Sequence, residues 1–103
     1  MAQQLVSFTE PIRSPDGDLY YARALGDVAD DGLWEGWIEF ALAGDERIVE
    51  TARETEQPNH ADLAYWARGL SVAYLEGALV RALRPVTAKS KSVGADIDLS
   101  QRP

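Results

Sequence analysis

Apolar and polar residues alternate most clearly over residues 33–42, which read LWEGWIEFAL. Counting by twos, one face of this stretch receives Trp34, Gly36, Ile38, Phe40 and Leu42. The other face receives an indole between two carboxylates, namely Glu35, Trp37 and Glu39. Because successive side chains of a strand point to opposite faces, the pattern predicts the central strand of a sheet that has one buried face.

Turn signals on both sides of this stretch indicate neighbouring strands. Pro15 and Gly17 in the segment SPDG suit a tight hairpin turn, and Gly44 with Asp45 suits another. A loop is expected over residues 26–32, where three aspartates and two glycines gather. The sequence therefore predicts a four-stranded antiparallel meander over residues 5–9, 18–25, 33–42 and 46–53.

The hydrophobic period becomes helical after residue 58. Asn59 suits the N-cap of a helix, and Asp62 places a carboxylate in its first turn. Apolar residues then recur at helical spacing until Gly69, which is typical of a helix end. Ser71 suits the N-cap of a second helix, and Pro85 is expected to end it.

Strands followed by helices predict the α+β class, with two short helices packed on one sheet face. The core is expected to join the central strand to the helices through Trp34, Ile38, Phe40, Leu63, Trp66, Leu75 and Leu79. Residues 1–85 are predicted to form one domain, and residues 86–103 a flexible tail. Gly77, inside the second helix, costs about 1 kcal/mol relative to Ala. That cost indicates a close approach there, by the core or by a second helix in a dimer.

The net charge of −7 narrows the classes of partner. An acidic chain repels phosphate and anionic lipid, so we expect neither nucleic acid nor membrane as a partner. No apolar run approaches the roughly 20 residues needed to cross a bilayer, and no signal-peptide pattern occurs, which predicts a cytoplasmic location. With no cysteine, one histidine and no phosphate-binding glycine loop, we expect no metal and no cofactor.

One candidate binding site consists of Glu35, Trp37 and Glu39. An indole flanked by carboxylates can hold a cationic group, and an exposed Trp on a sheet is a frequent anchor for a partner protein. The alternative is an ordinary solvated sheet face, on which Trp37 packs against a cross-strand neighbour such as Tyr20. The sequence leaves both interpretations open.

The connection over residues 53–65 is a second candidate site. Arg53 and the free N–H groups at the start of the first helix could bind an anion, with His60 nearby as an acid or base. Capping by Asn59 explains much of the same stretch without a ligand. No Ser or Cys nucleophile stands in a known catalytic motif, so no catalytic residue is assigned.

Three motifs follow one another in order. They are residues 31–40 (DGLWEGWIEF), residues 53–59 (RETEQPN) with 62–67 (DLAYWA), and residues 74–79 (YLEGAL). In this arrangement the chain resembles a family of small bacterial proteins of unknown function, over residues 5–84. The resemblance implies a bacterial cytosolic protein, and it implies no activity and no catalytic residue.

Two functions from different classes remain. The first is a non-enzymatic protein-interaction module, acting as a homodimer or as an adaptor for another protein. It is favoured by the acidic chain, the thin last strand and the lack of a complete catalytic set. The alternative is a small-molecule binder or enzyme subunit that binds an anion at residues 53–65. The sequence thus leans away from an enzyme.

Overall fold

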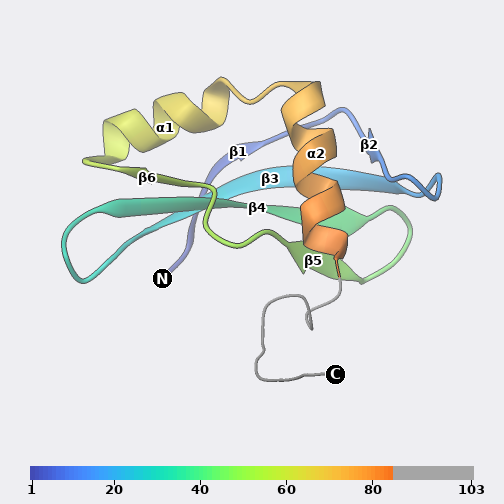
Figure 1. The fold of residues 1–103 in the computed structure, drawn as a ribbon, viewed down its shortest axis with the longest axis horizontal. Coiled ribbons are helices and arrows are strands. Elements are labelled where there is room, and N and C mark those ends of the chain that lie inside the picture. Colours follow the sequence, from blue (N-terminus) through green and yellow to red (C-terminus); the bar gives the residue numbers. More distant parts are fainter. Residues whose placement is uncertain (85–103) are drawn as a thin grey trace, which may run out of the picture.

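The sheet has helices on one side only. The computed structural model describes residues 1–84, which form six strands and two helices (Figure 1). The main strands are antiparallel neighbours in the order β1 (Gln3–Ser7), β3 (Leu19–Val28), β4 (Trp34–Leu42) and β5 (Ile48–Glu50). Two short strands, β2 (Ile12–Arg13) and β6 (Thr55–Gln57), pair with β3 and β4 respectively. The helices α1 (His60–Arg68) and α2 (Val72–Leu83) come last.

The predicted α+β architecture is therefore confirmed, with the two helices packed on one face of an antiparallel sheet. The caps are also as expected: Asn59 accepts a hydrogen bond from the N–H of Asp62, and Ser71 accepts one from the N–H of Tyr74. Gly17 closes its turn at a φ of 93°, which only glycine adopts readily. The predicted tail, residues 86–103, lies outside the described residues. Within residues 1–84, no helix combines the length and apolar character that crossing a membrane requires.

The predicted fourth strand, residues 46–53, is shorter than expected, because only Ile48–Glu50 forms β5. The backbone N–H of Thr51 donates to Ile38, and the hydroxyl of Thr51 accepts from the N–H of Ile38 at 3.1 Å. Because a side-chain hydroxyl replaces the backbone acceptor there, the chain leaves the ladder after β5. It rejoins the same edge of β4 when Glu54 donates to the carbonyl of Gly36. The short strand β6 follows, and the sequence did not indicate it.

The hydrophobic core joins β3 and β4 to α2. Ile38 and Phe40 are fully buried and belong to one cluster with Leu75, Ala78 and Leu79. From β3, the residues facing the helices are Tyr20, Ala22, Ala24 and Gly26, which pair with the apolar face of β4. The predicted contact of the central strand with the second helix is thus confirmed for Ile38 and Phe40.

Helix α1 packs on a pair of glycines. Gly26 and Gly36 are cross-strand partners in β3 and β4, and both are buried. A Cβ added to Gly36 would lie 2.7 Å from Cζ3 of Trp66 and 2.9 Å from Cδ1 of Leu63. A Cβ added to Gly26 would lie 2.5 Å from Cδ2 of Leu63. The sequence placed Gly26 in a loop, whereas β3 extends past it to Val28.

Two further expectations need correction. Trp34 is only half-buried, because it stands at the start of β4, where its ring packs in a T-shaped arrangement against His60 with the ring centroids 5.0 Å apart. Gly77 is exposed, and a Cβ there would meet only the Nη1 atom of Arg81, at 3.7 Å. No close approach within the described residues therefore accounts for a glycine in the middle of α2.

We expect Gly36→Ala to lower the free energy of unfolding by about 1–3 kcal/mol, because its methyl group would push Leu63 and Trp66 off the sheet. Urea unfolding followed by circular dichroism measures the change. The matched control is Gly69→Ala after α1, where φ is −90° and the nearest contact of a Cβ is 3.6 Å. The control should change stability by less than about 0.5 kcal/mol. Equal stability of the two variants would contradict the tight packing of α1.

Phe40→Ala should cost about 3–5 kcal/mol, the usual loss for a fully buried aromatic residue. Trp34→Ala should cost clearly less, since the Trp34 ring is partly in water and outside the main cluster. Unfolding curves of the two variants give the comparison, and Phe40→Leu serves as a milder version if Phe40→Ala does not fold. A larger loss of stability for Trp34→Ala than for Phe40→Ala would contradict the placement of Trp34 outside the core.

Candidate functional site

The face of the sheet opposite the helices carries the polar residues that the sequence singled out. We call it the uncovered face. Cross-strand partners share a face, so its side chains fall into rows across the sheet. Along β4, these rows are Asp27 with Glu35 and Glu56; Gln4 with Leu25 and Trp37; Ser7 with Arg23, Glu39 and Glu50; and Tyr21 with Ala41 and Ile48. Acidic and apolar rows thus alternate on one surface.

Trp37 lies in the middle of this face and is half-buried. Its cross-strand partner is Leu25, which is only 7% exposed although no helix lies over it. The expected neighbour Tyr20 is instead on the helix side, where it pairs with Leu42 and is 2% exposed. The physical reason is the register, because position 20 has the same parity as the buried Ala22 of β3. Trp37 and Leu25 together form an apolar centre on the uncovered face.

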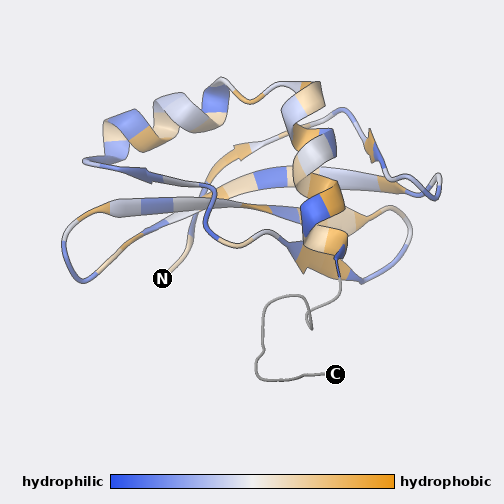
Figure 2. Cartoon of the chain, in the orientation of Figure 1, coloured by the Kyte–Doolittle hydropathy of each residue, from blue (hydrophilic) through white to orange (hydrophobic). Residues whose placement is uncertain are grey.

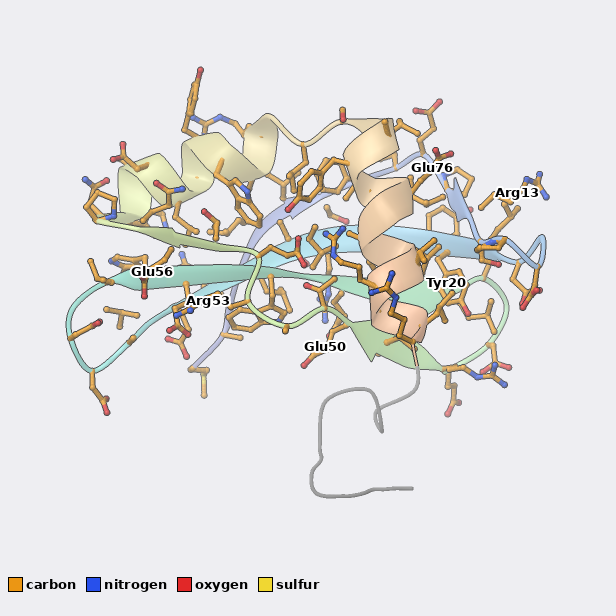
Figure 3. The ribbon with its side chains drawn as sticks, viewed as in Figure 1. Arg13, Tyr20, Glu50, Arg53, Glu56 and Glu76 are labelled. Atoms are coloured by element: carbon orange, nitrogen blue, oxygen red, sulfur yellow. The ribbon has the colours of Figure 1, made fainter. Side chains whose placement is uncertain are left out.

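Both glutamates beside Trp37 are bound by arginines of the same chain. Arg23 forms an ion pair with Glu39, whose side chain is 14% exposed, and it also donates to Gln4. Nη1 of Arg53 lies 3.3 Å from Glu35 and 3.2 Å from Glu56, and Figure 3 shows Arg53 and Glu56 side by side along β4 and β6. The sequence assigned Arg53 to the second candidate site. In the structure it binds Glu35, a member of the first candidate site with Trp37 and Glu39.

The uncovered face remains acidic after this pairing. Its rows hold five carboxylates, and only two guanidinium groups lie among them. At one end, the amino group of Met1 donates a hydrogen bond to Asp27 and lowers the pKa of that carboxyl below 3.8. At the other end, Tyr21 and Ile48 are 46% and 54% exposed. A shallow hollow beside these two residues extends over Ala41 toward Arg23 and Glu39.

The second candidate site does not come together. Arg53 reaches Glu35 on the uncovered face, whereas His60 stacks edge-on against Trp34, whose side chain points to the helix side. Residues 34 and 35 of a strand point in opposite directions, so β4 separates the two basic side chains. Asn59 acts as the N-cap of α1, with its Oδ1 atom 2.8 Å from the backbone nitrogen of Asp62.

A polar cluster that the sequence did not indicate joins the sheet edge to α2. Glu54 accepts hydrogen bonds from the hydroxyl of Tyr74 and from the guanidinium of Arg81, and its side chain is only 10% exposed. The Cζ atom of Arg81 lies 5.6 Å from the ring centroid of Tyr74. Tyr74 and Arg81 are seven residues apart, two turns on one side of a helix, and that spacing was the available signal.

This cluster anchors α2 to the segment between β5 and β6. Burial of the hydroxyl, followed by its hydrogen bond to Glu54 and the charge of Glu54, raises the pKa of Tyr74 above 10.0, while Arg81 opposes the rise. The contact needs a neutral phenol, so its stabilising effect is complete below pH 10 and is lost as the pH passes the raised pKa. Tyr74 and Arg81 of α2 both bond to Glu54, which is the arrangement of a structural anchor.

The pKa of Tyr74 gives a direct check of this cluster. In an absorbance titration of tyrosinate, we expect Tyr74→Phe to remove a component that ionises above pH 10. Glu54→Gln should lower the pKa of Tyr74, because it removes the negative charge that disfavours tyrosinate. Loss of a component at or below pH 10 in Tyr74→Phe would contradict the hydrogen bond to Glu54.

Comparisons with protein-family models, with curated proteins and with solved structures find no match to this chain. The resemblance to a family of small bacterial proteins therefore stays a prediction from three motifs. The cytoplasmic location likewise stays a prediction. Any function for the chain has to be inferred from its own side chains and their geometry.

Proposed function

We propose that this chain is a non-enzymatic protein-interaction module and that the uncovered face binds its partner. The observation that supports this most is that both helices lie on one side of the sheet, while the other side presents an apolar centre and exposed aromatic and aliphatic groups. A sheet face of this kind is solvated in many proteins. Here it combines the features that bind proteins, and these occur in one continuous surface.

The residue types on the uncovered face are those that dominate binding energy at protein interfaces. Trp, Tyr and Arg are the commonest hot spots, and they act best near the centre of a patch. Trp37 is central, Tyr21 lies toward one end, and Arg23 lies between them. Because Arg23 and Glu39 already hold each other, the surface is ordered before a partner arrives, which reduces the entropic cost of binding.

The charge of the uncovered face identifies the chemistry of the partner. Five carboxylates against two arginines attract a basic surface and repel an acidic one. The partner is accordingly a protein segment that combines lysine or arginine with apolar side chains. Attraction of this kind weakens as salt is added, because exposed charges are screened within about 8 Å at physiological ionic strength.

The alternative function, anion binding at residues 53–65, has less support. It requires Arg53 and His60 to converge, and they lie on opposite sides of β4. Arg53 is also occupied by two carboxylates, which would compete with an anionic ligand. The start of α1 alone remains of that site, and Asn59 caps it.

Peptides selected from a random display library against the immobilised chain test this proposal. We expect the selected peptides to be rich in Lys or Arg together with apolar residues, and to bind at least tenfold more weakly to Trp37→Ala, measured by calorimetric titration. The matched control is Tyr65→Ala, because Tyr65 is an aromatic residue that is 76% exposed on α1. It should leave the affinity unchanged.

A second pair of variants separates binding from folding. Glu35→Gln with Glu56→Gln removes two charges from the uncovered face and should weaken the basic peptides at low salt, with no loss of helical signal. Circular dichroism of every variant confirms that it is folded. Selected peptides that are acidic, or that respond to Tyr65→Ala and not to Trp37→Ala, would overturn the proposal.

A further inference from the structure

One side of α2 has no neighbour within the described residues. Ala73, Gly77, Val80 and Arg84 follow one another at helical spacing, and all four are exposed. They lie opposite Leu75, Ala78 and Leu79, which attach the helix to the core. This exposed side is far from the uncovered face, because α2 packs on the other surface of the sheet (Figure 1).

Two aliphatic side chains are exposed in the C-terminal half of α2. Val80 and Leu83 are 39% and 37% exposed, and Figure 2 shows the apolar colour concentrated in this half of the helix. Gly77 lies one turn before Val80, and within the described residues the place of its missing side chain is approached only by Nη1 of Arg81, 3.7 Å from where a Cβ would be. Burial of these aliphatic groups would be favourable, yet the described part of the chain provides nothing that covers them.

Opposite charges flank Val80 on this same side. Glu76 precedes Val80 by four residues and Arg84 follows it by four, about one helical turn each way. No ion pair joins either residue to another of the described residues. In a second copy of the helix that runs antiparallel to the first, Arg84 lies toward the end where the first copy has Glu76. The surface is therefore complementary to itself.

We propose that a second copy of this chain packs against this side of α2, with the two helices antiparallel about a two-fold axis between Gly77 and Val80. In that register Val80 of each copy faces Gly77 of the other, whose missing side chain leaves room for it. Arg84 faces the small Ala73 and lies one turn from Glu76 of the other copy, where the two can pair. An isologous contact of this kind uses one surface twice, so self-complementary charge selects a second copy over other partners.

The contact also explains the glycine within α2. Packed helices lie 8–10 Å apart depending on the residues between them, and small residues permit the shorter distances. A single helix pair covers less than a standard interface, so the dimer should dissociate in the micromolar range or above. It should weaken with salt, since Glu76 and Arg84 are exposed.

Sedimentation equilibrium of the full chain over a wide concentration range tests the proposal. We expect a mass that rises from one copy toward two. Gly77→Gln should reduce association at least tenfold, because it fills the space for Val80, and it should leave the monomer folded, because glutamine is a better helix former than glycine. Circular dichroism at low concentration verifies the fold.

Charge reversal tests the register. Glu76→Arg and Arg84→Glu should each weaken association, and the double variant should restore it, because the two charges exchange places across the axis. Glu46→Arg, on the exposed turn before β5, is the control and should have no effect. A chain that stays monomeric at all concentrations overturns the proposal. So does association that ignores Gly77→Gln, or a double reversal that restores nothing.

Discussion

The close approach of α1 to the sheet depends on two glycines that face each other across β3 and β4. Leu63 and Trp66 occupy the space that the side chains of Gly26 and Gly36 would need. This contact fixes the start of the helical part of the chain, and α2 follows α1 after a connection of only three residues. The position of α2 over Phe40 and Ile38 therefore depends indirectly on the same glycine pair.

Because both helices pack on the same face of the sheet, the two faces make different contacts. Glu54, Arg53 and Thr51 come from one short segment, and each binds a different part of the molecule. Thr51 holds the β4 backbone, Arg53 crosses to the uncovered face, and Glu54 reaches α2. The break in the last strand is what allows neighbouring residues to serve opposite sides. Arg53 and His60, which looked like parts of one candidate site, thereby lie on opposite sides of β4.

Local patterns predicted much of this fold. The alternation over residues 33–42 and the caps Asn59 and Ser71 act through nearest neighbours, so they can be read without the rest of the chain. The errors came from contacts between distant residues. Gly26 looks like a loop residue until Leu63 is placed above it, and the β5–β6 break depends on a hydroxyl bonded to β4 thirteen residues away. For the candidate site, alternation placed Trp37 with Glu35 and Glu39 correctly on one face. The ion pair of Arg53 with Glu35 could not be predicted in the same way, because it depends on the register in which the strands pair.

The position of both helices on one side of the sheet has a consequence for how strongly the proposed interaction module would bind. Two copies joined along α2 would turn their uncovered faces away from the shared axis, so neither binding surface is used up by pairing. A partner with two basic segments, or two partners held on one scaffold, could then occupy both faces at once. The second contact would form within an existing complex at a high effective concentration, and the pair would hold far more tightly than either face alone. Avidity of this kind lets a small domain bind a partner tightly although each individual contact is weak.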